Sequence, residues 1–189
     1  MSPARVRSLR ADAQLNQDRL LEAAAAAFAR EGAETSLKGI AKEAGVGIAT
    51  LYRRFPTREL LIEAVYSNET ARLCAAAGEL LSTHPAVPSL RAWMDRFVDY
   101  MWTKRGMTGA LHSVLVADDD VMYTRGLLAD AIATLMTAGV ADDTIRADIA
   151  PYDVLMALGG VTLIAGDPSQ NALGCRLLDL LIDGLRNHG

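Results

Sequence analysis

Residues 35–61 read TSLKGIAKEAGVGIATLYRRFPTRELL, and this stretch decides the fold. Its first half places apolar residues at positions i, i+3, i+4 and i+7 of one helix face, namely Leu37, Ile40, Ala41 and Ala44. Either Thr35 or Ser36 has a hydroxyl that can accept a hydrogen bond from the first turn. The pattern predicts a short helix that opens at one of these two residues and buries one face.

A second short helix is predicted after a turn. The run Gly45-Val46-Gly47 breaks the first helix, and a new one is expected to begin near Ile48. Pro56 ends it, because the residue before a proline is pushed out of the α region. We expect its inward side chains to be Leu51, Tyr52 and Phe55. Two short helices joined by a glycine-containing turn form a helix-turn-helix, whose second helix can enter the major groove of DNA.

Longer helices are predicted on both sides of this pair. The preceding helix runs from about Leu15 to Arg30, and Gly32 stops it. Its inward face is expected to hold Leu20, Leu21, Ala24, Ala25 and Phe28. Thr57 is placed to cap a following helix from Arg58 to about Ser82.

The rest of the chain is also predicted to be helical, because Ala- and Leu-rich segments fill it and no segment alternates as strands do. Turn signals at Pro88, Gly106, Gly139 and Pro151 divide it. The predicted helices lie near 89–105, 107–117, 120–138, 152–165 and 171–187. We therefore predict an all-α protein with a three-helix head in residues 1–60. The long fourth helix joins this head to a larger helical body in residues 61–189, without a flexible linker.

Charge is distributed unevenly along the chain. The net charge is -4, but residues 1–58 have ten Lys/Arg and six Asp/Glu, whereas residues 59–189 have nine and seventeen. A basic head can bind phosphate backbones by releasing their counterions, while an acidic body keeps the protein soluble. Chance segregation of charge is the alternative to this interpretation.

Several classes of protein are disfavoured by the sequence. Cys74 and Cys175 lie far apart, which argues against a disulfide framework. The N-terminus has no apolar leader, and the longest uncharged stretch, Val154–Gly166, is too short to span a membrane. We therefore expect a cytoplasmic protein without membrane contact. The three histidines have no ligand spacing, and no nucleophile with a base or phosphate-binding glycine loop is present, so we expect no metal, no cofactor and no enzyme activity.

A family resemblance emerges from the order and spacing of residues 44–61. These include Ala44-Gly45-Val46, Thr50-Leu51-Tyr52, Phe55, Thr57-Arg58 and Leu60-Leu61. The head of about 60 residues resembles the TetR family of bacterial transcriptional regulators. The resemblance implies a DNA-binding head, and a body that binds a small-molecule effector and dimerises through its last two long helices.

The resemblance also implies which side chains contact double-stranded DNA. Three positions match phosphate contacts, namely Thr50, Tyr52 and Arg58. Five match positions that face the groove, namely Lys38, Gly47, Ile48, Ala49 and Arg53. Arg53 suits bidentate recognition of guanine, and Arg54 is expected to be exposed beside it. Ile48 and Gly39 depart from the family pattern, since a polar or basic residue and an acidic residue are common there, and Ile48 suits a thymine methyl group instead.

The segment before the first helix contains Arg5, Arg7 and Arg10. Such an arm can enter the minor groove of DNA. A solvated tail is the alternative interpretation.

An effector pocket is predicted in the body, where aromatic and methionine side chains gather. The candidates are Trp93, Phe97, Tyr100, Met101, Trp102, Met107, His112, Met122 and Tyr123. His112 or Tyr123 can orient a polar group of the ligand. Ordinary core packing is the alternative for each of these residues.

A homodimer interface is predicted on the last two helices, where apolar stripes recur at helical spacing. The candidates are Leu155, Leu158, Thr162, Leu173, Leu177, Leu180, Leu181 and Leu185. Packing within the chain can bury part of these stripes instead. Together the predictions describe a repressor that a small effector releases from a palindromic operator. The alternatives are a helical interaction module with a non-functional head, or an enzyme on a helical bundle.

Overall fold

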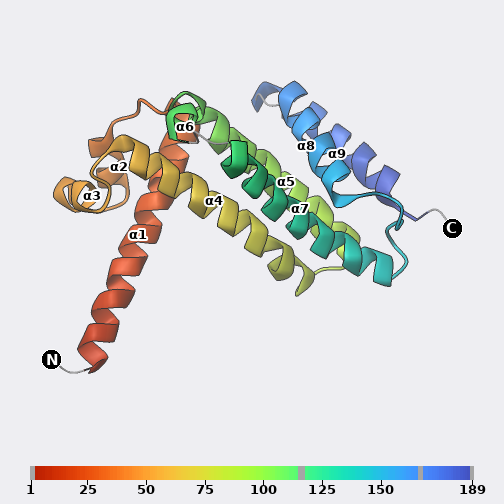
Figure 1. Ribbon diagram of the computed structural model, residues 1–189, viewed down its shortest axis with the longest axis horizontal. Coiled ribbons are helices and arrows are strands. Elements are labelled where there is room, and N and C mark those ends of the chain that lie inside the picture. Colours follow the sequence, from red (N-terminus) through yellow and green to blue (C-terminus); the bar gives the residue numbers. More distant parts are fainter. Residues whose placement is uncertain (1–2, 115–117, 166–167, 188–189) are drawn as a thin grey trace. The chain divides into compact units, whose positions relative to one another are not determined.

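The computed structural model describes residues 3–114, 118–165 and 168–187, with the side chains of 3–13, 112–114, 118–119 and 168 left undescribed. Over these ranges the chain is helical, and no β-strand is present (Figure 1). The helices are α1 (Pro3–Glu31), α2 (Leu37–Glu43), α3 (Ile48–Arg54), α4 (Arg58–Leu81), α5 (Ala86–Gly106), α6 (Thr108–Val114), α7 (Asp118–Ala141), α8 (Pro151–Ile164), the short 3-10 turn η1 (Pro168–Gln170) and α9 (Asn171–Leu185). The all-α prediction is confirmed.

Two helix starts differ from the sequence prediction. α1 begins at Pro3 and not near Leu15, so the segment predicted as an arm is helical, although the side chains of its arginines lie outside the described residues. α5 begins at Ala86, which places Pro88 inside the first turn. A proline is tolerated there, because the first N–H groups of a helix have no partner within the helix.

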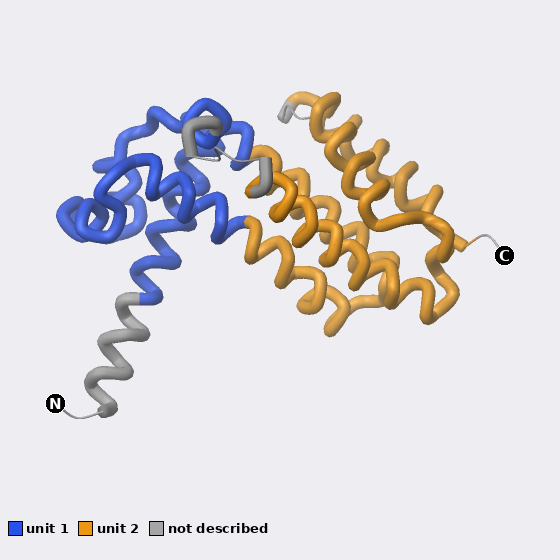
Figure 2. Tube along the Cα trace, viewed as in Figure 1, with its two compact units in different colours: residues 1–69, 103–116 blue, residues 70–102, 117–189 orange. Residues whose placement is uncertain are grey.

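The chain divides into two compact units (Figure 2). Unit 1 comprises residues 1–69 and 103–116, and unit 2 comprises residues 70–102 and 117–189. The divisions fall inside α4 and α5, so each of these helices contributes residues to both units. The division into a head of residues 1–60 and a body of residues 61–189 stays a prediction.

The core of unit 1 forms around the predicted inward face of α1. Leu20, Leu21, Ala24, Ala25 and Phe28 are all buried, as are the apolar residues of α2. From the end of α5 and from α6, Met107 and Leu111 join this core. Gly32 ends α1 with a φ of +83°, a left-handed conformation that favours glycine.

A close backbone approach holds the end of α5 against α1. A Cβ atom added to Gly106 would lie 2.1 Å from the carbonyl oxygen of Phe28 and 3.3 Å from the Cα of Ala29. The neighbouring atoms belong to backbone and cannot rotate away. Only glycine therefore fits at this position.

Unit 2 contains a row of buried aromatic rings along α5. Trp93 stacks on Phe97 with ring centroids 5.8 Å apart, and Tyr100 follows at 6.1 Å from Phe97. The indole N–H of Trp93 donates to the carbonyl of Leu73 at 2.8 Å, and the Tyr100 hydroxyl lies 3.2 Å from that of Thr70. Buried polar atoms with partners cost little, so this row joins α5 firmly to the second half of α4.

The end of α7 differs from the sequence prediction. Gly139 was expected to end the helix, but α7 continues to Ala141, and Asp143 makes the reversal with a φ of +61°. Gly139 is needed for packing, because an added Cβ would lie 2.5 Å from the Cδ1 atom of Ile145. The segment after α7 then pairs with the end of α9, where the Arg146 N–H donates to the carbonyl of Leu185 at 3.0 Å.

α8 is apolar on nearly every side and packs against both α7 and α9. It has 14 residues. Among the described residues no helix combines the length and the apolar character that a membrane span needs.

We predict that Gly106→Ala destabilises the protein by about 3 kcal/mol, because the added methyl group forces two backbones apart. Urea denaturation followed by circular dichroism measures the loss. Gly109→Ala is the matched control, since a Cβ there meets nothing within 4 Å. Its free energy of unfolding should stay the same or rise by less than about 1 kcal/mol. Equal stability of Gly106→Ala and the control would contradict the proposed close approach.

Candidate nucleic-acid interface

The turn between α2 and α3 is built from backbone hydrogen bonds and one left-handed glycine. Gly45 has a φ of +68°, and its N–H donates to Lys42 at 3.1 Å. The next N–H, of Val46, donates to the carbonyl of Ala41 at 2.9 Å. Ser36 caps α2, because its hydroxyl oxygen accepts from the Gly39 N–H at 3.3 Å. Of the two cap candidates that the sequence left open, Thr35 and Ser36, the cap is Ser36.

α3 is held in unit 1 by the buried side chains on one of its faces. Leu51 is completely buried, and Phe55, which ends the helix, is buried beside it. Tyr52 was also expected to point inward, but it is 49% exposed. The reason is geometric: in two helical turns only the residues three or four apart share the inward face, and Leu51 and Phe55 already occupy it.

The side chains predicted to contact DNA are all accessible in unit 1. Exposed positions are Lys38, Gly47, Ile48, Ala49, Tyr52, Arg53 and Arg54, while Thr50 and Arg58 are half-buried. Three cations, one phenol and one apolar side chain therefore lie on the outward surface of a helix-turn-helix. Such a surface can bind phosphate oxygens and the edges of bases.

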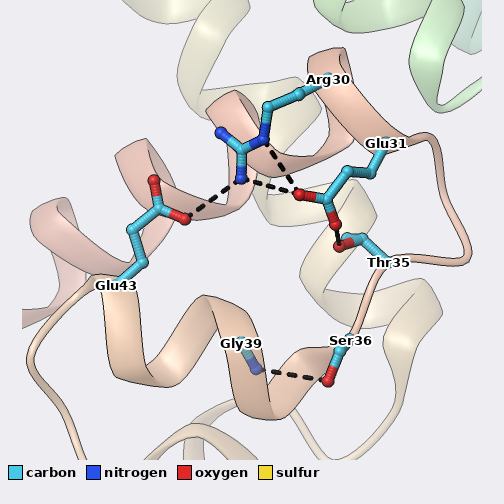
Figure 3. Close-up of polar contacts among 6 residues, drawn as sticks. All are labelled: Arg30, Glu31, Thr35, Ser36, Gly39 and Glu43. Atoms are coloured by element: carbon cyan, nitrogen blue, oxygen red, sulfur yellow. Dashed lines mark hydrogen bonds and ion pairs between the residues drawn. The ribbon is translucent and has the colours of Figure 1, made fainter.

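A polar network joins the end of α1 to α2 (Figure 3). Arg30 pairs with Glu31 at 2.9 Å and with Glu43 at 3.4 Å, and the Thr35 hydroxyl donates to the other oxygen of Glu31 at 2.5 Å. The hydrogen bond from Thr35, with that from Arg30, lowers the pKa of Glu31. Thr35 thus serves this network, and capping of α2 is left to Ser36. Exposed pairs of this kind add little stability, so the network's effect is to orient α2.

Arg58 is bonded to the loop that precedes α2. Its Nη1 atom donates to the carbonyl of Ala33 at 2.5 Å and to that of Thr35 at 2.7 Å. A guanidinium has five N–H donors, so the same side chain still has capacity for another acceptor. A structural role for Arg58 was missed by sequence reasoning, because its carbonyl partners lie more than 20 residues away in the chain.

A hollow of about 290 Å³ lies between α1 and α3. Asn16 and Gln17 of α1 line it together with Thr50, Arg53 and Arg54. The Arg54 guanidinium donates to the side-chain oxygen of Gln17. Sequence reasoning missed Asn16 and Gln17, since isolated polar residues on a helix normally indicate only a solvated face.

The residues predicted to line an effector pocket divide between the core and the surface, and the pocket stays a prediction. Trp93, Phe97, Tyr100 and Met107 are core residues, and Met107 belongs to unit 1. By contrast Met122 and Tyr123 are 53% and 70% exposed on α7. The side chain of His112 lies outside the described residues. Met101 and Trp102 are half-buried, and Trp102 lines a cavity of unit 2.

The predicted dimer residues divide between the inside and the outside of unit 2. On α8, Leu155, Leu158 and Thr162 are buried within the unit and can contribute little to an interface. Leu185 of α9 is buried as well. The accessible ones are Leu173, Leu177, Leu180 and Leu181, of which Leu180 is 68% exposed.

The exposed apolar side chains of α8 lie away from its buried face, at Tyr152, Met156, Leu163 and Ile164. Sequence periodicity could not choose between the faces, because α8 is apolar all round. A helix that is apolar on every side is normally buried on every side, so the sequence did indicate that both faces of α8 pack against something.

Comparison with family models identifies both parts of the chain. Residues 20–65 match the model described as bacterial regulatory proteins, tetR family. Residues 86–187, just over half of the chain, match the model described as transcriptional regulator SbtR-like, C-terminal domain. A search of curated proteins gave no match.

Solved structures with the same fold extend over nearly the whole chain. A TetR transcriptional regulator from Streptomyces coelicolor is 47% identical, with a TM-score of 0.86, covering 91% of this chain and 99% of that chain. A TetR regulatory protein from Mycobacterium vanbaalenii is 29% identical, with a TM-score of 0.73 and coverage of 94% and 99%. A transcriptional regulator from Cytophaga hutchinsonii, 19% identical with a TM-score of 0.66 and coverage of 90% and 98%, shares the fold.

We predict that Arg58→Ala lowers the free energy of unfolding by about 2 kcal/mol, because two carbonyls lose a charged donor. Arg58→Lys should recover part of the loss, since an ammonium group can reach one acceptor but lacks the planar fork. Arg19→Ala, an exposed position on α1, is the control and should be close to neutral. Denaturant unfolding of all three variants provides the measurement, and a neutral Arg58→Ala would show that these bonds do not hold the loop.

Proposed function

Since this chain belongs to the TetR family of bacterial regulatory proteins, we propose that it is a homodimeric repressor that leaves a palindromic operator when a small effector binds. DNA-binding regulation of transcription is the function of the family. The repressor role, the effector and the symmetry of the operator are our proposals for this chain. The observation that carries the DNA-binding part of the proposal is the accessible row of Ile48, Tyr52 and Arg53 on α3, away from the buried Leu51.

Base recognition is assigned to the exposed first turn of α3 and to Arg53 in its last turn. Arg53 suits a guanine, because its guanidinium can donate to O6 and N7 together. Ile48 suits a thymine methyl group, and Gly47 and Ala49 are small enough for the helix to approach the groove closely. Lys38 of α2 adds a cation at the edge of the same surface.

Phosphate contacts are assigned to Thr50, Tyr52, Arg54 and Arg58. A hydroxyl, a phenol and two guanidinium groups suit this task, because each presents a donor to an anionic oxygen. Arg54 and Arg58 are already bonded to protein acceptors, so their donors are oriented before DNA arrives. Pre-ordered side chains lose less entropy on binding than mobile ones do.

Dimerisation is assigned to the outward face of α8 and α9. On α8, Tyr152, Met156 and Leu163 recur at spacings of four and seven residues, and Gly160 lies between them on the same face. On α9, Leu173, Leu177, Leu180 and Leu181 form the neighbouring stripe. A second copy presenting the same face would bury both stripes in a four-helix seam, the symmetric solution for a homodimer.

A two-fold dimer predicts the form of the operator. Each protomer places one α3 in a half-site, and the half-sites are roughly 34 to 36 Å apart when they occupy successive major grooves. Effector binding in unit 2 would release DNA by favouring a dimer with a different spacing. The effector must bind the two states with different affinities, and about 1.4 kcal/mol of difference corresponds to each tenfold change.

We predict that selection from a random DNA pool enriches a palindromic sequence. Arg53→Ala should weaken binding to it at least about tenfold and relax preference at one base pair of each half-site. Binding by the wild type should weaken steeply as salt rises. Arg125→Ala, an exposed cation on α7, is the control and should bind normally. No enrichment, or identical losses for the two variants, would argue against recognition by α3.

We also predict that Leu163→Glu combined with Leu180→Glu converts the dimer to a folded monomer. Both side chains are largely exposed within one chain, at 78% and 68%, so charges there should harm only the seam. Tyr123→Glu is the matched control, because this α7 side chain is equally exposed but lies off the seam. Sedimentation gives the mass, and a dimer that persists in the double variant would place the interface elsewhere.

A further inference from the structure

The hollow between α1 and α3 is lined by polar groups that suit an anion. They are the guanidinium groups of Arg53 and Arg54, the hydroxyl of Thr50 and the side-chain amides of Asn16 and Gln17. The described residues that line the hollow include no carboxylate, and Asp18, the next residue of α1, is bonded to Gln14 at 2.9 Å. Guanidinium, hydroxyl and amide groups all donate hydrogen bonds to phosphate oxygens. The hollow therefore has the chemistry of a site for a backbone phosphate.

One hydrogen bond crosses the hollow. The Nη2 atom of Arg54 donates to the side-chain oxygen of Gln17, a residue 37 positions earlier in the chain. Because an amide is neutral, this acceptor holds the guanidinium in place and leaves its positive charge uncancelled. A guanidinium has five N–H donors, so most of them stay available for a second acceptor. The bond therefore orients Arg54 and keeps it able to bind a phosphate.

A brace between α1 and α3 is the alternative role for this bond. Arg54 is exposed and Gln17 is half-buried, so both groups can bond to water when the bond between them is absent. A hydrogen bond that water can replace contributes little to stability. Leu20 and Leu51 are already buried in the core of unit 1, and they anchor the two helices independently of it. The accessible position of the bond therefore favours a role in binding.

We infer that Gln17 is a positioning residue for DNA binding, which holds the Arg54 guanidinium in the hollow for contact with a backbone phosphate. The inference rests on the proposed function, which assigns Arg54 to a phosphate. It extends the DNA-binding site from the helix-turn-helix to α1, since Gln17 acts through Arg54 and not on the DNA itself. An arginine ordered in advance avoids the cost of ordering it on binding, which corresponds to about twofold to tenfold in affinity.

The test is a double-mutant cycle on the full-length protein, with DNA binding measured at several salt concentrations. Two duplexes serve as probes, the palindromic sequence enriched from the random pool and an unrelated sequence of the same length. Gln17→Met keeps the length of the side chain but removes the acceptor. It should weaken binding of both duplexes by the same factor, about threefold, because phosphate contacts carry no sequence information.

Arg54→Ala measures what the phosphate contact itself contributes. It should weaken binding more than Gln17→Met does, and it should lower the steepness of log affinity against log salt by about 0.9, because one phosphate contact is lost. Gln17→Met should keep the salt slope of the wild type, since Arg54 still reaches the phosphate. In the Arg54→Ala background Gln17→Met should change nothing, because the group that Gln17 positions is absent.

Gln170→Met is the control with the same chemical change, at an exposed position in unit 2. It should bind both duplexes as the wild type does. Urea denaturation checks the fold, and the midpoint of Gln17→Met should match that of the wild type, since water replaces the lost bond.

A loss of the same size for Gln17→Met in the Arg54→Ala background overturns the inference, because Gln17 then acts on DNA directly or through the fold. Wild-type affinity of Gln17→Met for both duplexes overturns it as well, as does an unchanged salt slope in Arg54→Ala. In each of these results the wild type still binds the palindromic duplex, so the proposed function stands. A wild type that binds neither duplex contradicts the proposed function itself, and the inference falls with it.

Discussion

A helix of seven residues is too short to persist in water, and α3 keeps its form because Leu51 is buried in the core of unit 1. The outward side chains depend on that single anchor. Gly45 adds the second constraint, since its left-handed backbone directs the chain from α2 into α3 within the four residues 44–47. The assignments of α3 residues to bases or phosphates follow from these two positions, because they decide which side of α3 remains outside.

Polar contacts around the helix-turn-helix orient its parts. The Arg30, Glu31 and Glu43 cluster is exposed, so its net free energy is small, yet it joins α1 to α2 through specific donors. Arg58 does the same for the loop before α2, by binding two carbonyls that belong to no regular helix. Arg58 therefore has two roles: it holds this loop, and it keeps its remaining donors near the surface assigned to DNA.

Unit 2 combines a closed core with two accessible regions of different chemical character. The aromatic row of α5 fills the core, with its N–H and hydroxyl groups bonded inside the unit. One region is the apolar outer face of α8 and α9, which we assign to contact with a second copy of the chain. The other is the carboxylate-bearing cavity between α5 and α9, whose lining residues are not those of the outer face. The cavity and the outer face therefore use different sides of α9.

The sequence by itself determined the helical class, the helix-turn-helix and most helix ends, since these depend on periodicity, capping residues and glycine or proline within a few positions. It left Thr35 and Ser36 equivalent as caps, and the folded structure decided between them, because the Thr35 hydroxyl is bonded to Glu31, four residues before it, while Ser36 accepts from Gly39. Periodicity also could not orient α8, whose faces are similarly apolar, nor show that Gly106 and Gly139 each lie where an added Cβ would collide with another segment. The cavity between α5 and α9 could not be predicted from the sequence either. Asp99 and Leu178 meet only when α5 and α9 pack, and local sequence patterns contain no information about residues that far apart.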